Sequence, residues 1–434
     1  MMNTDYIDHN PDLRVQRIDT AIWLLSLFCI LTFFLATDLG TISILGFLVA
    51  MSLYVSAWPR KAVKAMLAYP VLWIFPGLAF LSLLWSRDPA ASARAGAELL
   101  TTTGFGIVLA TIQRPRSYIL AFMCALLLAV ILSTLFGGEE GIGYTGEVAL
   151  HGLFGSKNNY AMIIGLLMIS SMSVLCNSSH ARTFRAIAWV AFLVCPFLIV
   201  LTRSTGGIIS TGTGLCAVFL GVLSARLPKK YRPALVFFTC SIGAIVAAGL
   251  LLIISNGTSL DEVLLSLGKD PDLTGRTHIW MVAAELIRLH PMLGFGYQAF
   301  WIKGFLEPES LWRFMHDTTR SGVHFHNLYY ETAIELGYIG VFALGLSLAW
   351  TMAKIVSWNL RSPGYDAAFF LGLFAFYASR AMTEVDFIGP FAYGSLLLPA
   401  ALVYASCARP ARLRRDRQPA GRAGAWVPPA TISR

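Results

Sequence analysis

Residues 274–296 read TGRTHIWMVAAELIRLHPMLGFG, and residues 324–340 read HFHNLYYETAIELGYIG. These two stretches bring Arg, His, Asn and Glu to the point where the longest polar interruption of the chain returns to its hydrophobic part. Only 13% of the 434 residues are charged, whereas soluble domains carry about 25%. In so apolar a chain, ionisable groups kept at such a boundary predict a functional site.

Working outward from these stretches, the rest of the sequence is organised in long apolar runs, and hydrophobic residues make up 56% of it. A membrane-spanning helix needs about 20 predominantly apolar residues. Twelve runs approach or reach this length; they cover roughly 21–37, 40–57, 69–85, 96–112, 117–136, 158–176, 186–202, 205–225, 233–255, 325–357, 364–382 and 387–406. We therefore predict an all-α, polytopic membrane protein with about 12 transmembrane helices.

The basic residues are unevenly divided between the two sides of this predicted arrangement. Of the 33 Lys and Arg, 22 fall before the first run, after the even-numbered runs or in the C-terminal tail. The other 11 include six in the long loop 256–325. The positive-inside rule then places both termini in the cytoplasm and the long loop in the periplasm. The net charge of +9 therefore reflects the topology of the chain and a contact of its basic residues with the inner leaflet. It does not indicate nucleic-acid binding.

The predicted organisation has three parts. Residues 1–20 form a cytoplasmic segment, residues 21–408 form one transmembrane domain that includes loop 256–325, and residues 409–434 form a basic, disordered tail. Within the loop, apolar residues recur at helical spacing and predict an amphipathic helix; they are Ile279, Trp280, Val282, Ala283, Leu286 and Ile287. His290-Pro291 ends this helix, and an irregular segment rich in Trp and Phe follows.

Two arginines are candidates for binding an anion. Arg203 ends the seventh apolar run and precedes Ser204. It either extends to the interface as an arginine at a membrane boundary commonly does, or grips a phosphate with its planar guanidinium. Arg276 begins the loop helix, where the helix dipole disfavours a cation, so it is either a solvated charge or one half of an anion site.

His326 is a candidate for proton transfer because imidazole can take or release a proton near neutral pH. It could act as a general base toward a hydroxyl nucleophile, or only hydrogen-bond a loop carbonyl. His324 and His326 could also form a metal pair, but no third ligand stands at a convincing spacing, so we predict no metal. Glu331 and Glu335 lie on the following helix, and Glu335 is interpreted as part of a packing or polar-network element.

Several of these motifs together resemble one family of proteins. They are Gly275-Arg276 with Trp280, His290-Pro291 with Gly294-Phe295-Gly296, and His326-Asn327 with Glu335-Leu336-Gly337. The combination resembles the O-antigen ligase/polymerase superfamily, bacterial membrane glycosyltransferases that act on polyprenyl-diphosphate-linked glycans. Leu83-Leu84-Trp85-Ser86 and residues 152–158 resemble its exopolysaccharide polymerase branch, which usually has a histidine where this chain has Ser156.

The resemblance implies twelve helices of the GT-C type, an inverting reaction, and neither a cofactor nor a metal. It also implies two arginines on the donor diphosphate and one histidine near the acceptor. By motif these are Arg276, Arg203 and His326. Further candidates for binding the substrate are Asn327, Lys157, Asn158, Trp280, Glu335 and Arg380.

The predicted function is to polymerise polyprenyl-diphosphate-linked oligosaccharide repeat units at the periplasmic face of the bacterial inner membrane. A chain-length regulator and export machinery are candidate partners besides the lipid-linked glycan and the bilayer. The first alternative is a ligase that moves finished glycan to a lipid or protein acceptor. The second is a transporter or flippase, although transporters tend to have repeated halves and polar residues at the membrane midplane. Neither feature is evident in this sequence.

Overall fold

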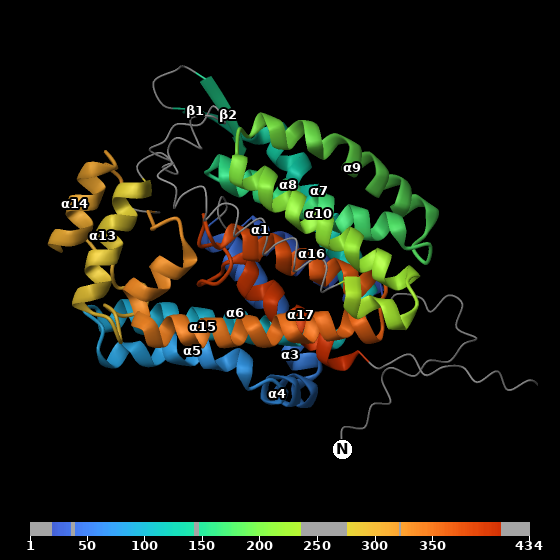
Figure 1. The fold of residues 1–434 in the computed structure, drawn as a ribbon, viewed down its shortest axis with the longest axis horizontal. Coiled ribbons are helices and arrows are strands. Elements are labelled where there is room, and N and C mark those ends of the chain that lie inside the picture. Colours follow the sequence, from blue (N-terminus) through green and yellow to red (C-terminus); the bar gives the residue numbers. More distant parts are fainter. Residues whose placement is uncertain (1–19, 36–39, 143–146, 236–275, 321–322, 409–434) are drawn as a thin grey trace, which may run out of the picture.

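The computed structural model of the protein describes residues 20–35, 40–142, 147–235, 276–320 and 323–408 (Figure 1). Four predicted elements therefore lie wholly or mostly outside the described residues. They are the N-terminal segment 1–20, the ninth run at 233–255, the start of loop 256–325 and the tail 409–434.

Every other predicted apolar run coincides with a helix. The helices are α1 (Thr20–Phe34), α3 (Thr41–Ala57), α5 (Val71–Leu81), α6 (Pro89–Ile112), α7 (Pro115–Phe136), α8 (Lys157–Cys176), α9 (Arg182–Leu201), α10 (Thr205–Arg226), α15 (Leu328–Arg361), α16 (Tyr365–Arg380) and α17 (Tyr393–Cys407). Two short 3₁₀ helices, η1 (Ser82–Leu84) and η2 (Lys229–Tyr231), follow α5 and α10. The chain is a helical membrane protein, as the apolar runs predict.

The lengths of these helices qualify the predicted number of spans. Six of the described helices are long and apolar enough to cross a membrane, and a seventh if α3 and the short helix α4 (Pro59–Ala68) form one bent span. Three further apolar stretches are shorter, namely α1, α17 and α5 with η1. The total of twelve spans stays a prediction.

Small residues bring the central helices into close contact. α10 packs along α16 and also against α8, while α17 packs against α6 and α15. A Cβ added at Gly372 would lie 2.8 Å from the carbonyl oxygen of Gly214, and one added at Gly221 would lie 2.8 Å from the Cα of Ala368. Such small residues let helix backbones approach closely where lipid offers no hydrophobic drive for association.

A smaller unit lies at one end of the bundle, beside the start of α15 (Figure 1). It contains α13 (Arg276–Leu289) and α14 (Leu306–Phe314). α13 is the predicted amphipathic helix: it ends before His290-Pro291, and Ile279, Ala283, Leu286 and Ile287 of the predicted stripe are buried. The prediction of an irregular segment after it was incomplete, because the chain there forms α14.

Residues 290–296 and the first turns of α15 are joined through their backbones. α15 is interrupted at Gly337, whose φ is 63°. The N–H groups of Phe295 and Gly296 donate to the carbonyls of Ile334 and Glu335, at 2.9 and 2.8 Å. A side chain at Gly337 would overlap the backbone of Met292, so this close approach requires glycine.

The loop between η1 and α6 packs on the same junction. The Trp85 indole donates to the carbonyl of Leu293 at 2.8 Å, and the backbone N–H of Arg87 donates to Phe295 at 3.0 Å. The Arg87 guanidinium also donates twice to the Glu307 carboxylate, at 3.3 Å each, and so holds the start of α14. Three separate motifs singled out in the sequence thus form one assembly at this end of the protein.

An antiparallel β-hairpin follows α7, between the predicted apolar runs 117–136 and 158–176. Its strands are β1 (Gly138–Ile142) and β2 (Glu147–Gly152), with Glu140 opposite Ala149. The strands are short and rich in Gly and Glu, so the sequence gives little β signal. The hairpin precedes the N-terminus of α8 (Figure 1).

Candidate active site

Four residues from three parts of the chain meet at the N-terminus of α13. Arg276 Nη2 lies 3.1 Å from Glu384 Oε1 and 3.3 Å from His326 Nδ1, and Nη1 donates to the carbonyl of Thr383 at 3.1 Å. Glu384 and Thr383 belong to the turn between α16 and α17, and His326 directly precedes the N-cap of α15. Two residues predicted to be catalytic, Arg276 and His326, are therefore in contact.

The Glu384 carboxylate is the centre of this cluster. Oε1 also accepts from Asn158 Nδ2 at 2.8 Å, while Oε2 lies 3.4 Å from His326 Nδ1 and 4.0 Å from His324 Nε2. Burial alone would raise the pKa of Glu384, but the hydrogen bond with His326 and the positive charge of Arg380 lower it to about 2. The group is thus a carboxylate at neutral pH.

The position of His326 is determined by the residues that flank it on the C-terminal side. His326 has a φ of 50°, and Asn327 caps α15 by accepting from the N–H groups of Tyr329 and Tyr330. Asn327 Nδ2 donates to the carbonyl of Met382 at 3.1 Å. Asn327, a predicted substrate-binding residue, therefore ties the His326 segment to the turn that carries Glu384.

The backbone of Phe325 is held from both sides. Its N–H donates to Glu331 Oε2 at 2.7 Å, and its carbonyl accepts from the Trp280 indole at 2.7 Å. Trp301 donates to the other oxygen of Glu331 at 3.0 Å. Trp280, another predicted substrate-binding residue, thereby fixes the segment that bears both His324 and His326.

The turn that carries Arg203 reaches the cluster through a short relay. Arg203 is exposed, lies between α9 and α10, and has a φ of 54°. The next residue, Ser204, donates to Asn158 Oδ1 at 2.8 Å, and Asn158 in turn donates to Glu384. The structure thus connects the backbone beside Arg203 to the carboxylate that binds Arg276.

Lys157 and Asn158 begin α8, which Ser156 caps by accepting from the N–H of Asn158 at 3.2 Å. The backbone N–H of Lys157 donates to Glu140 of the β-hairpin at 3.3 Å. Of the predicted pair, Asn158 is therefore part of the cluster, and Lys157 stands next to it at the same helix end.

Two other predicted site residues serve the surrounding scaffold. The Arg380 side chain is 1% exposed, and its Nε donates to Asp386 at 2.8 Å within its own turn. Glu335 accepts from the backbone and side-chain amides of Gln298 at 3.1 and 2.9 Å. Glu335 thus belongs to the polar network that holds the 290–298 segment, as its sequence context indicated.

Glu384 is the functional candidate that sequence reasoning missed. Glu384 lies between the last two apolar runs, but no feature of Glu384 alone distinguished it from other acidic residues. The available signal was a carboxylate lying in a short turn between two apolar runs. Such an ionisable residue at a membrane boundary deserves to be treated as a site candidate.

His324, His326 and Glu384 also form a group whose ligand atoms lie within 4.8 Å of one another. Two imidazoles and a carboxylate are a donor set found in catalytic zinc sites. Here, however, the Arg276 guanidinium contacts two of the three groups, and His324 Nδ1 accepts from the backbone N–H of His326 at 3.1 Å. A neutral His324 then carries its proton on Nε2, the atom that faces Glu384, so the residues fit a hydrogen-bonded network better than a metal centre.

Comparisons with known proteins agree with the motifs. Residues 189–345, which include Arg203, Arg276 and His326, match the family model described as O-antigen ligase. Over 338 residues the chain is 29% identical to the exopolysaccharide production protein ExoQ of Rhizobium meliloti, and the match covers 75% of each chain. With the apolar helices, these matches indicate a multi-pass membrane protein. These matches support the resemblance to the O-antigen ligase/polymerase superfamily that the motifs indicate.

Proposed function

We propose that the protein is an inverting glycosyltransferase of the exopolysaccharide polymerase branch. It joins polyprenyl-diphosphate-linked oligosaccharide repeat units into an exopolysaccharide or O-antigen-type polymer at the periplasmic face of the bacterial inner membrane. The observation that carries this proposal is the contact of Arg276 Nη2 with both His326 Nδ1 and Glu384 Oε1, at 3.3 and 3.1 Å. A fixed cation and a proton acceptor thus meet at one carboxylate.

The arginines would act on the donor. As the bond between the sugar and the diphosphate breaks, negative charge grows on the diphosphate, and fixed cations in a poorly hydrated site stabilise that charge. A guanidinium suits this role because its planar donors can bind two phosphate oxygens at once. The Ser204–Asn158–Glu384 relay supports a common site for Arg203 and Arg276, since it joins the two segments that carry them.

His326 would act on the acceptor. The oxygen of an acceptor hydroxyl attacks the anomeric carbon from the face opposite the diphosphate, so the configuration inverts. The carbon–oxygen bond to the diphosphate breaks, and its electron pair leaves with the phosphate oxygen. Nε2 of His326 accepts the hydroxyl proton as a general base. Glu384 then faces the resulting imidazolium from the Nδ1 side, at 3.4 Å.

The two halves of the reaction share one atom, His326 Nδ1. Arg276 can only donate to it, whereas Glu384 can only accept from it. When a diphosphate draws the Arg276 guanidinium toward itself, Nδ1–H can donate to Glu384, which leaves the lone pair on Nε2 for the acceptor. Donor binding would thereby favour the tautomer that acts as a base.

Ligase activity is the second candidate, and the matching family model, described as O-antigen ligase, favours it. The chemistry at the site would be the same, and only the acceptor would differ. Under either proposal the termini are cytoplasmic and loop 256–325 is periplasmic, because the basic residues concentrate on the other side. A chain-length regulator and export machinery remain proposed partners.

Reconstitution with purified lipid-linked repeat units tests the proposal. A polymerase yields products of several repeat units that stay attached to polyprenyl diphosphate, and it releases one polyprenyl diphosphate per joining step. A ligase leaves repeat length unchanged and transfers glycan only when its lipid or protein acceptor is added. A flippase moves the substrate across the bilayer without releasing polyprenyl diphosphate. Either of the last two outcomes would overturn polymerisation.

A further inference from the structure

Helix α4 does not run in the same direction as the helices of the bundle. It follows α3 after a single residue, Trp58, and its axis is bent by 102° from that of α3. Two residues, Tyr69 and Pro70, separate α4 from α5, which returns into the bundle. α4 starts where the predicted apolar run 40–57 ends, so the predicted arrangement places it at the membrane boundary and across the direction of the spans. Figure 1 draws it beside one end of α5, on the outside of the bundle.

One side of α4 is firmly attached to the protein. Ala62 and Ala65 are buried, and the carbonyl of Met66 accepts from the Trp73 indole of α5 at 2.7 Å. The Met66 side chain also reaches toward α6, where a Cβ added at Gly104 would lie 3.4 Å from it. The opposite side of α4 therefore has a fixed orientation relative to the bundle.

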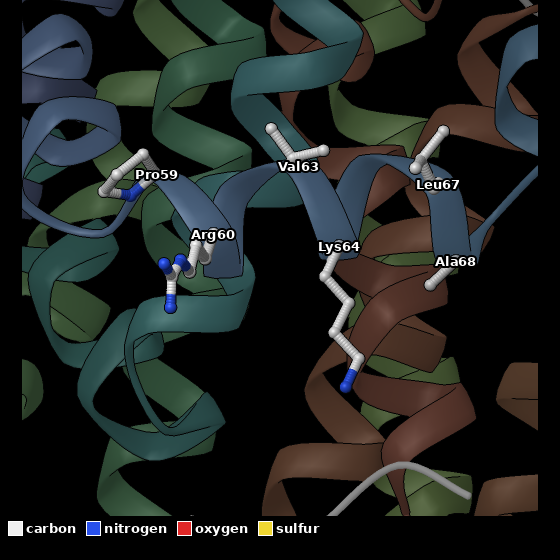
Figure 2. A pocket seen from close by; sticks show the side chains of 6 residues that line it. All are labelled: Pro59, Arg60, Val63, Lys64, Leu67 and Ala68. Carbon is white, nitrogen blue, oxygen red and sulfur yellow. The ribbon is translucent and has the colours of Figure 1, made fainter.

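That opposite side combines basic and apolar residues. Val63 is 56% exposed and Leu67 is 77% exposed, and Arg60 and Lys64 are exposed as well. Residues four apart lie one above the other on a helix, so Val63 and Leu67 form one stripe and Arg60 and Lys64 form the next. Figure 2 shows the Arg60 and Lys64 side chains extending to the same side of α4, away from Val63.

The basic stripe has no acidic residue near it in the sequence, since none occurs between Asp38 and Asp88. Arg60, Lys64, Val63 and Leu67 also border an open surface hollow, together with Pro59 and Ala68 (Figure 2). A helix at a membrane boundary with apolar side chains beside cations matches a surface where phosphate head groups meet acyl chains.

We propose that the exposed side of α4 is a binding site for anionic phospholipid. Arg60 and Lys64 hold the head-group phosphate, and Val63 and Leu67 enter the acyl-chain boundary. This inference goes beyond glycan transfer and does not depend on it. It rests on the expected cytoplasmic location of the α3–α5 connection, because anionic lipids give the inner leaflet a negative surface that attracts such basic segments.

The test is photocrosslinking of the full-length protein in nanodiscs. A photoreactive amino acid at Val63 reports which lipid touches α4, with phosphatidylglycerol and phosphatidylcholine supplied in equal amounts. We expect crosslinks to phosphatidylglycerol to predominate. The variant Arg60→Gln/Lys64→Gln should lose this preference by about fivefold for each charge removed. High salt should weaken it in the wild type, because the charges are exposed and thus screened.

A matched control removes two charges elsewhere on the same expected side. Lys229→Gln/Lys230→Gln, in η2, should leave the lipid preference at Val63 unchanged. Equal crosslinking to both lipids in the wild type would overturn the proposal. So would crosslinks from Val63 to a peptide of residues 1–19, because the acidic N-terminal segment and not lipid would then cover α4. Neither outcome bears on glycan transfer, which is measured separately.

Discussion

Arg276 and Glu384 form an ion pair at 3.1 Å although 108 positions separate them in the chain. The pair explains why a cation stands at the N-terminus of α13, where the helix dipole alone would disfavour it. Their side chains are only 16% and 9% exposed, so bulk salt screens the pair weakly. The anionic partner expected for Arg276 is therefore the Glu384 carboxylate of the protein itself. A substrate diphosphate would bind Arg276 beside this carboxylate or in its place.

Arg276→Lys should reduce polymer formation by on the order of 10²-fold, because an ammonium cannot contact Thr383, His326 and Glu384 together and bind a diphosphate. Initial rates with lipid-linked repeat units measure the effect. Arg288→Lys is the matched control, since Arg288 lies at the other end of α13 with a side chain that is 77% exposed. Equal activity of both variants would show that Arg276 is only a charge at a helix end, without a role in binding the diphosphate.

His326→Ala should lower the rate by about 10²- to 10⁴-fold, which is typical for loss of a general base, and leave protein level and donor binding nearly unchanged. His324→Ala should have a much smaller effect. Glu331→Gln should be intermediate, because Glu331 holds the backbone of Phe325 and not the substrate. Normal polymerisation by His326→Ala would contradict the assigned role.

Glu384→Gln keeps the shape of the side chain but removes the charge that Arg276 and His326 share. We expect lower activity and lower thermal stability. The pKa of Glu384 is lowered from 4.5 to about 2 in the folded protein, so its ionised form stabilises the fold. This contribution is fully present above pH 4.5 and declines as the pH falls toward 2. The difference in melting temperature between wild type and variant should be constant from pH 5 to 8 and shrink below about pH 4.5.

The reaction should proceed in excess chelator, because the charge on the leaving diphosphate is assigned to arginines and not to a metal. Polymer length after prolonged incubation with EDTA measures this, with and without added Zn²⁺ or Mg²⁺. Activity that collapses with chelator and returns with a cation would make His324, His326 and Glu384 a metal site instead, in which case His324→Ala should be as damaging as His326→Ala.

Ser310→Cys in α14 and Ser433→Cys in the tail should be labelled from opposite sides of the membrane. The background for this experiment replaces the seven native cysteines. The uneven distribution of the basic residues predicts a tail in the cytoplasm and a loop outside. Labelling of both positions from the same side would show that the number of spans is wrong.

Local patterns in the sequence were enough to predict most helices, the buried stripe of α13, and Arg276 and His326 as candidates. The hydrophobic period of about 3.6 residues and the helix ends are local properties, so they can be read without tertiary information. Glu384 could not be found in this way, because its role arises from contacts with Asn158, Arg276 and His326, which are far away in the chain.

The break in α15 was also hidden from the sequence. Apolar residues continue on both sides of Gly337, so the run reads as one uninterrupted span. The reason for the break is the docking of Met292 against Gly337, a tertiary contact that hydropathy does not report. The roles of Asn327 and Trp280 could be anticipated only as part of a motif; the structure adds that both hold the histidine segment in place.

The bond from the Trp85 indole to Leu293 spans 208 positions, and this separation sets an order for biogenesis. A polypeptide synthesised from its N-terminus contains the Trp85 loop long before Leu293 exists. Gly337 follows later still, and Glu384 is added only after Gly337. The nascent protein therefore cannot assemble its cluster of Arg276, His326 and Glu384 until α16 and the turn after it have left the ribosome.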